Sequence, residues 1–293
     1  MNNNNCVNEI SIETTTLAED IVADILNDLF PGGVCMEENK DTCIVKAYTS
    51  KSEKEIKKDL DSSLDLLRKN SEFNVGSLLY KINTVNPDLW FDEWKKGYDI
   101  IREGNIVIVP AWMEYDKKDN EKVIKIDPNK SFGSGQHEST KMCLSLIQGL
   151  DLKDKKIVDI GTGSGILALA SAAIGAKDIE AYDIDDIAIN AAKENVKING
   201  FSKYITVDNS NILDSVTGKF DIVLANITSE VLKALAKDLK RYLNKNGIII
   251  ISGILTSLES EVIDVYKSLG FKIIQRLNLG EWVAFELSLD YGN

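Results

Sequence analysis

Strand-like and helix-like segments alternate regularly from Lys156 to the end of the chain. Short apolar runs typical of buried strands lie at 157–160, 179–182, 204–207, 220–224 and 247–251. Stretches of helical periodicity separate them at 164–174, 186–199, 229–243 and 257–269. Such alternation predicts an α/β fold in which a parallel sheet carries helices on both faces.

The last segments depart from this alternation. Two strand-like segments, 271–277 and 282–287, flank the sequence Asn278-Leu279-Gly280-Glu281, which predicts an antiparallel hairpin. By analogy of fold, a parallel sheet that ends in such a hairpin is typical of methyltransferases with a Rossmann-like domain and not of dehydrogenases.

The first 86 residues show a different order of elements. Strands are expected at 9–13, 33–37, 42–48 and 77–85, and amphipathic helices at 17–29 and 56–67. Strand–helix–strand–strand–helix–strand is the order of a smaller, ferredoxin-like α+β domain. We therefore expect a domain at 1–86, a connector at 87–104 and the larger domain at 105–293, which begins with a strand at 106–109. The aromatic residues of the connector serve either packing or a substrate cleft: Trp90, Phe91, Trp94 and Tyr98.

Composition excludes several classes of protein. Hydrophobic residues make up 44% of the chain and charged residues 27%, which is typical of a globular protein. No apolar run reaches the length of a membrane span, and the start of the chain does not read as a secretory signal. Four cysteines without paired spacing and a single histidine predict that there is no metal site. We expect a cytoplasmic, monomeric protein in a reducing compartment.

Acidic residues dominate the charge of the chain. The formal net charge is −12, and residues 1–100 hold 11 basic against 19 acidic side chains. This charge disfavours direct binding of nucleic acid and favours a basic partner, although acidity also serves solubility.

The strongest local motif is the glycine-rich segment 158–166, which reads Val-Asp-Ile-Gly-Thr-Gly-Ser-Gly-Ile. A buried strand here runs into a turn and then a helix, so the backbone can approach a ligand closely. The dinucleotide fingerprint has its third glycine three residues after the second. Here that position is Ile166, and the third glycine comes early, at Gly165. The spacing disfavours a nicotinamide dinucleotide.

Polar residues follow the next strands of the expected sheet. Asp183 ends the second strand, 22 residues after Gly161, where a carboxylate can bind both hydroxyls of a ribose. The polar segment 208–211 follows the third strand and is either an adenine-facing loop or a plain turn. Asn226 ends the fourth strand, where its amide can accept and donate hydrogen bonds beside the reacting groups.

Segment 126–140 precedes the larger sheet and reads Ile-Asp-Pro-Asn-Lys-Ser-Phe-Gly-Ser-Gly-Gln-His-Glu-Ser-Thr. Together with segments 159–165, 182–185 and 225–227, it resembles the ribosomal protein L11 methyltransferase family, whose members are class I S-adenosylmethionine-dependent methyltransferases. The family loop usually reads F-G-T-G-x-H-x-T-T. Here Ser134 and Ser139 keep a hydroxyl, whereas Gln136 and Glu138 replace a usual threonine and proline.

The resemblance implies an activity and a set of site residues. The implied reaction is transfer of methyl groups from S-adenosylmethionine to lysine and N-terminal amino groups of ribosomal protein L11. The implied contacts to the cofactor are Thr140, Gly161, Gly163, Asp183 and Asn226. Asn226 would also position the reactants. His137 would either act as a general base or hold its loop.

Three alternative functions share parts of these patterns. A methyltransferase of nucleic acid or small molecules shares the sheet, but Asn226 is followed by Ile-Thr-Ser and not by the Pro-Pro-aromatic sequence of many such enzymes. A dehydrogenase would need the other glycine spacing. A binding module would use the first domain, which lacks every cofactor motif, and would leave Asp183 and Asn226 unexplained. We therefore expect the first domain to recognise a protein substrate.

Overall fold

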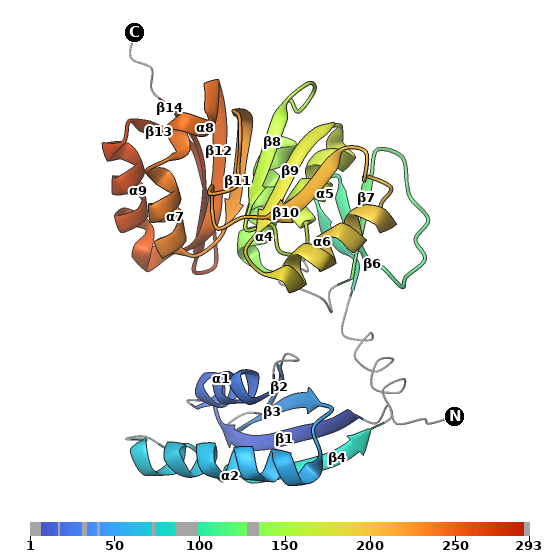
Figure 1. Ribbon diagram of the computed structural model, residues 1–293, viewed down its shortest axis with the longest axis vertical. Coiled ribbons are helices and arrows are strands. Elements are labelled where there is room, and N and C mark those ends of the chain that lie inside the picture. The colour runs from blue at the N-terminus through green and yellow to red at the C-terminus, as the bar shows by residue number, and fades with distance from the viewer. Residues whose placement is uncertain are drawn as a thin grey trace. The chain divides into compact units, whose positions relative to one another are not determined.

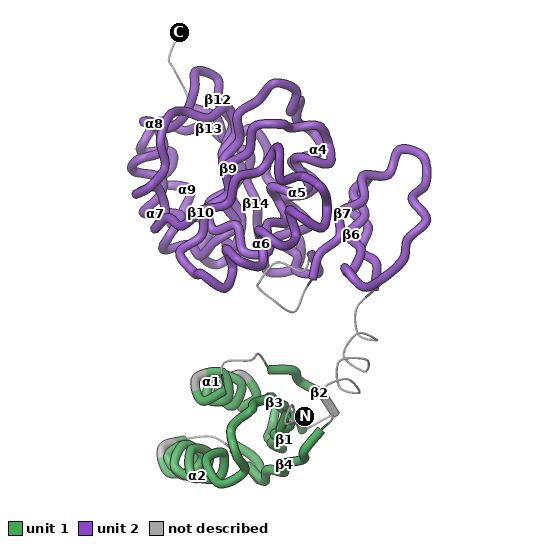
Figure 2. The backbone as a smooth tube through the Cα atoms, turned by 45° about the vertical axis from the view of Figure 1, so that its right-hand side comes forward, with its two compact units in different colours: residues 1–98 green, residues 99–293 purple. Residues whose placement is uncertain are grey.

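The computed structural model describes residues 7–16, 18–30, 34–39, 42–71, 74–85, 99–127 and 135–289. The chain forms two compact units, residues 1–98 and 99–293, which Figure 2 colours separately. Their boundary falls within the connector expected at 87–104, whose aromatic residues, Trp90, Phe91, Trp94 and Tyr98, lie outside the described residues. Among the described residues, no helix is both long and apolar enough to span a membrane.

The first unit has the predicted ferredoxin-like order. Its elements are β1 (Val7–Thr15), α1 (Glu19–Leu29), β2 (Val34–Asn39), β3 (Thr42–Thr49), α2 (Glu53–Asn70) and β4 (Tyr80–Val85). The strands form an antiparallel sheet in the order β2-β3-β1-β4. Ile10 and Ile12 of β1 face Ala47 and Val45 of β3, and all four are buried in the core of this unit.

The second unit is built on a seven-stranded sheet (Figure 1). Its strands are β8 (Lys156–Ile160), β9 (Asp178–Asp183), β10 (Ile205–Asn209), β11 (Phe220–Asn226), β12 (Leu243–Leu255), β13 (Phe271–Leu279) and β14 (Trp282–Leu289). Their order is β10-β9-β8-β11-β12-β14-β13. Strand β14 runs antiparallel to its two neighbours, β12 and β13, and the other neighbouring strands pair in parallel. The Rossmann-like methyltransferase fold with a C-terminal hairpin is confirmed.

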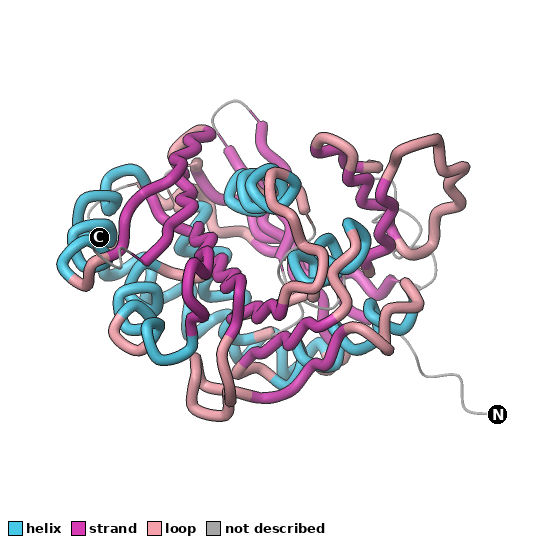
Figure 3. Tube along the Cα trace, turned by 90° about the horizontal axis from the view of Figure 1, so that it is seen from above, coloured by secondary structure: helices cyan, strands magenta, loops and turns pink. Residues whose placement is uncertain are grey.

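Helices cover both faces of this sheet, as Figure 3 shows from above. They are α4 (Glu138–Gln148), α5 (Ile166–Ile174), α6 (Asp186–Ile198), α7 (Ser229–Ala236), α8 (Leu239–Tyr242) and α9 (Glu259–Ser268). Successive strand residues point to opposite faces: Ile157 packs in the core beneath α4, α5 and α6, and Val158 packs beneath α7, α8 and α9. Both faces are therefore apolar, which explains the continuous apolar runs of these strands.

Several elements differ from the expectation. The structure adds α4 and a second small sheet, formed by β5 (Ile101–Glu103), β6 (Ile106–Pro110) and β7 (Lys122–Ile126), of which only β6 was expected. The helix expected at 229–243 is interrupted between α7 and α8. There the amide groups of Lys237 and Asp238 bond to carbonyls three residues earlier, which tightens the helix and ends α7.

The order of the strands locates the site. From β8 the chain continues through β9 and β10 on one side, and β11 and β12 lie on the other. A crevice forms where the direction reverses, at the carboxyl ends of β8 and β11, and open α/β sheets bind their ligands there.

Candidate functional site

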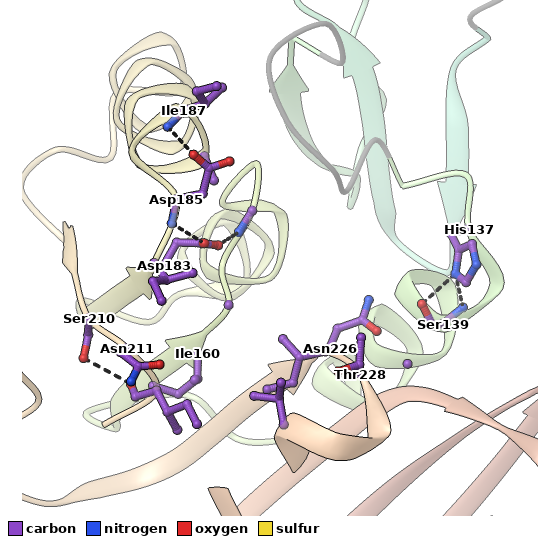
Figure 4. A pocket seen from close by; sticks show the side chains of 18 of the residues that line it. His137, Ser139, Ile160, Asp183, Asp185, Ile187, Ser210, Asn211, Asn226 and Thr228 are labelled. Atoms are coloured by element: carbon purple, nitrogen blue, oxygen red, sulfur yellow. Dashed lines mark hydrogen bonds between the residues drawn. The ribbon is translucent and has the colours of Figure 1, made fainter. Parts of the chain in front are cut away.

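A cavity of about 820 Å³ lies at the carboxyl ends of β8, β9 and β11. Its volume falls within the range of about 300–1,000 Å³ that small-molecule sites occupy. The sequence-predicted residues that line it are Gly161, Gly163, Asp183, Asn226 and His137. In Figure 4, His137 and Ser139 lie across the cavity from Asp183 and Asp185.

The glycine turn needs its three glycines. Gly161, Gly163 and Gly165 have φ values of 70°, 55° and 82°, a left-handed conformation that other residues adopt only at a cost. A Cβ atom on Gly161 would collide with Cγ2 of Ile227. A Cβ atom at position 161 therefore has no room, and the backbone of the turn borders the cavity.

Asp183 is held beside this turn by two backbone hydrogen bonds. Its Oδ2 accepts from the amide of Gly163 at 2.9 Å, and its Oδ1 accepts from the amide of Asp185 at 3.1 Å (Figure 4). Asp185, the N-cap residue of α6, accepts in turn from the amide of Ile187. Each oxygen of Asp183 keeps acceptor capacity toward the cavity, which suits a pair of ribose hydroxyls.

Asp159 supports the turn from beneath. Its Oδ2 accepts from the hydroxyl of Thr162 at 2.7 Å and from the amide of Ala168 at 3.3 Å. Burial raises the pKa of Asp159 to about 6, although these two hydrogen bonds lower it. Its buried Oδ1 has no hydrogen-bond partner among the described residues.

Asn226 lines the cavity at the end of β11, and Thr140 lies behind it. Thr140, in the first turn of α4, is fully buried, and its Oγ1 accepts a hydrogen bond from Nδ2 of Asn226 at 3.2 Å. Thr140 therefore contacts a residue that lines the cavity but does not itself line it. This bond leaves Oδ1 of Asn226 as an acceptor without a partner among the described residues.

The comparisons with known proteins agree with this geometry. Residues 7–289 match the family model "Ribosomal protein L11 methyltransferase (PrmA)". The chain belongs to the ribosomal protein L11 methyltransferase family. Membership makes it an S-adenosylmethionine-dependent protein methyltransferase, which confirms the prediction from the sequence.

Individual relatives match over nearly their whole length. Proteins named ribosomal protein L11 methyltransferase from Alkaliphilus oremlandii and Caldicellulosiruptor bescii are 37% and 34% identical to this chain, each over 94% of it and 96% of the relative. A solved structure of ribosomal protein L11 methylase from Lactobacillus delbrueckii subsp. bulgaricus is 33% identical, with a TM-score of 0.63. It covers 66% of this chain and 100% of its own.

The single histidine of this methyltransferase begins α4. Nδ1 of His137 accepts from the backbone amide of Ser139 at 3.2 Å and lies 2.7 Å from the Ser139 hydroxyl. Nδ1 therefore caps the helix, and a neutral ring carries its proton on Nε2. The ring lines the cavity and meets Trp282 edge-on, with centroids 4.6 Å apart. The geometry favours the interpretation of His137 as the residue that holds its segment.

The sequence did not single out Trp282 as a site residue. Trp282 begins β14, where it pairs with Leu255 of β12 and reaches the cavity. Its position depends on the pairing of distant strands, so no local signal predicts it. Ser210 and Asn211, from the polar segment 208–211, also line the cavity, and the amide of Ser210 bonds to the carbonyl of Asp183 at 2.9 Å.

Seven of the fifteen residues of the family segment 126–140, residues 128–134, lie outside the described residues. The described part includes Ile126 and Asp127 at the end of β7 and residues 135–140 at the start of α4. Among the described residues, no group of three or more His, Cys, Asp or Glu side chains is arranged to hold a metal ion.

Proposed function

We propose that this enzyme methylates amino groups of ribosomal protein L11, on lysine side chains and at the N-terminus. The observation that carries this proposal is Asn226, which lines the same cavity as the glycine turn and Asp183 and whose Nδ2 is bonded to Thr140, so that Oδ1 is the acceptor it offers. An amine that enters this cavity meets an oxygen that accepts its N–H group. Relatives that match almost the whole chain carry the corresponding name.

Asp183 and the backbone at Gly161 and Gly163 would hold the cofactor. When bound, S-adenosylmethionine would supply a methyl group on a sulfonium, and the neutral thioether that remains is a good leaving group. The enzyme then has to align two reactants and exclude water between them. Asn226 performs this alignment: Thr140 fixes its Nδ2, so its Oδ1 keeps one direction toward the incoming amine.

The incoming amine attacks only in its neutral form, whereas a lysine side chain in water has a pKa of about 10.4. A carbonyl oxygen such as Oδ1 of Asn226 accepts an N–H group without adding a negative charge that would stabilise the ammonium form. We therefore assign Asn226 the task of orienting a neutral amine. Loss of the proton to water before binding needs no base from the protein, and His137 then serves to hold α4.

The first domain, 1–86 with the connector 87–104, is proposed to recognise the protein substrate, and 105–293 to carry out the chemistry. The cavity residues all lie in the second unit. The acidic excess of residues 1–100 suits a basic ribosomal protein. We also propose that the enzyme is cytoplasmic, acts as a monomer and does not itself bind nucleic acid.

Mass spectrometry of ribosomal protein L11 tests the activity. Purified enzyme, cofactor and unmodified L11 should give added methyl groups on lysine and N-terminal amino groups. L11 from a strain that lacks this gene should lack the same groups. Methylation of ribosomal RNA in a parallel reaction, with L11 unchanged, would overturn the proposal in favour of a nucleic-acid methyltransferase.

A truncated chain tests the role of the first domain. Residues 99–293 contain the whole described cavity, so this fragment should bind cofactor but lose methylation of L11. Methylation by the intact chain should also weaken with added salt, because charges are screened over about 8 Å at physiological ionic strength. Methylation of L11 by the fragment at the full rate would show that recognition lies elsewhere.

A further inference from the structure

Asn195 of α6 and Asn199, the C-cap residue of this helix, face strand β7 one helical turn apart. Asn199 binds both backbone groups of Lys125: its Oδ1 accepts from the amide and its Nδ2 donates to the carbonyl, each at 2.7 Å. Oδ1 of Asn195 accepts from the amide of Asp127 at 3.0 Å. Both side chains thus attach α6 to the small sheet.

Asn195 makes one contact that Asn199 lacks. Its Nδ2 donates to the carbonyl of Ser164 at 2.9 Å, and the side chain is buried, with 1% exposed. Ser164 lies between Gly163 and Gly165 in the glycine turn. One buried amide therefore joins the cofactor turn to Asp127, the residue of the family segment that directly follows β7.

Packing of α6 against the turn supports this connection. A Cβ atom on Gly165 would lie 3.3 Å from Cβ of Ala192, so the helix rests directly on the turn. Ala192 and Asn195 are three residues apart and share a face of α6. The turn is left-handed at three positions, so a hydrogen bond in its middle restricts a flexible piece of backbone.

We propose that Asn195 is a positioning residue, which holds the glycine turn in its binding conformation and ties it to the start of the segment after β7. With the carbonyl of Ser164 fixed, the amide of Gly163 keeps its bond to Asp183. The inference rests on the proposed function only for its effect on methyl transfer, since its effect on cofactor binding is independent of the methylated substrate.

Loss of the bond between Asn195 and Ser164 should reduce cofactor affinity, because it lowers the fraction of molecules in which the turn has its binding conformation. Without Asn195, the turn of the ligand-free protein samples other conformations, and binding must select the competent one. An apparent Kd rises by the inverse of the competent fraction, so a turn that is correct about a tenth of the time binds about tenfold more weakly.

The experiment compares Asn195→Ala with Asn199→Ala in the full chain. Calorimetry measures the Kd of S-adenosylhomocysteine, and thermal unfolding measures Tm. Asn199→Ala loses bonds to β7 and Asn195→Ala loses the bond to Asp127 directly after it, so both should have a lower Tm. Only Asn195→Ala should raise the Kd, by about tenfold. Hydrogen exchange of the ligand-free protein should rise in residues 160–168 for Asn195→Ala and not for Asn199→Ala.

Two further variants keep the inference testable if alanine prevents folding. Asn195→Asp keeps an oxygen that accepts from the amide of Asp127 but places a carboxylate against the carbonyl of Ser164. Its Kd should therefore rise at least as far as that of Asn195→Ala. Asn195→Ser retains a short hydroxyl and should fall between wild type and Asn195→Asp. A Kd within twofold of wild type in every folded Asn195 variant, or an equal rise for Asn199→Ala, would overturn the inference.

The activity measurement separates this inference from the proposed function. If L11 is not the substrate, no variant methylates it, while the difference in Kd and hydrogen exchange between Asn195 and Asn199 variants remains. If L11 is the substrate but Asn195 is only structural, Asn195→Ala and Asn199→Ala should lose methylation in equal measure.

Discussion

Asn226 at the end of β11 donates a hydrogen bond to Thr140 at the start of α4, with Nδ2 and Oγ1 at 3.2 Å. The two residues are 86 positions apart in the chain. The bond turns the amide nitrogen toward Thr140 and leaves the carbonyl oxygen of this cavity residue as an acceptor. We expect Thr140 to act through Asn226, whereas the direct contact with the cofactor that the resemblance implied stays a prediction.

Thr140→Val should lower kcat for methyl transfer while changing the Kd of the cofactor little. Valine keeps the shape of the side chain but removes the acceptor, so the amide of Asn226 is no longer held in one orientation. Loss of a hydrogen bond between neutral groups corresponds to about 0.5–1.5 kcal/mol, or a factor of about 2–12 in rate. Steady-state kinetics and calorimetry measure the two quantities. Thr140→Ser keeps the hydroxyl and should retain most of the rate. A serine variant as slow as valine would contradict this role.

Asp183→Ala should weaken binding of S-adenosylmethionine by about 1.5–3 kcal/mol, because charge-assisted hydrogen bonds are stronger than neutral ones. Calorimetry measures the change. The matched control is Asp178→Ala, which removes an exposed carboxylate at the other end of the same strand, outside the cavity. An unchanged Kd in the Asp183 variant would mean that this carboxylate only binds the amides of Gly163 and Asp185.

Gly161→Ala should lower both the free energy of unfolding and the cofactor affinity. The left-handed backbone alone costs about 1–2 kcal/mol for a residue with a Cβ atom, and here that atom also collides with Ile227. Gly218→Ala is the control: its φ is 85°, but its Cβ atom would approach nothing closer than Nζ of Lys156 at 3.6 Å. Urea unfolding should show the larger loss for Gly161→Ala. Equal losses would show that Ile227 moves aside without cost.

The sequence predicted the large sheet well because its strands are buried on both faces. Ile157 and Val158 pack in two different cores, so β8 reads as an apolar run. Asp183 was predicted for a related reason. Once the apolar run locates β9, its last residue is known, and ligands of open α/β sheets bind at the carboxyl ends of the strands.

Helix α4 escaped prediction because its buried face includes polar residues. Ser139 and Thr140 are almost completely buried, so the hydrophobic periodicity that identifies a helix is broken in its first turn. Asn195 and Trp282 are different cases. Their roles depend on contacts with Ser164 and Leu255, which lie far away in the sequence, and no spacing within α6 or β14 reveals them.

Stability should depend on pH through Asp159. Burial raises the pKa of this carboxyl from 3.8 in the unfolded chain to about 6 in the folded protein. Between these values the folded protein keeps a proton that the unfolded chain has released, so stability falls as pH rises through this window. Below pH 4 the contribution is fully present, and above pH 6 it is lost.

Asp159→Asn cannot lose a proton and should lack this dependence. Two pKa units correspond to about 3 kcal/mol, so the free energy of unfolding of Asp159→Asn, relative to wild type, should rise by about 2–3 kcal/mol between pH 4 and pH 7. Urea unfolding at half-unit steps of pH measures this difference, in which the other carboxyl groups cancel because both proteins contain them. Asparagine also keeps an oxygen that accepts from Thr162 and Ala168, so the turn is preserved. Parallel curves for the two proteins would show that Asp159 is ionised in the folded protein throughout this range, with its charge stabilised despite burial.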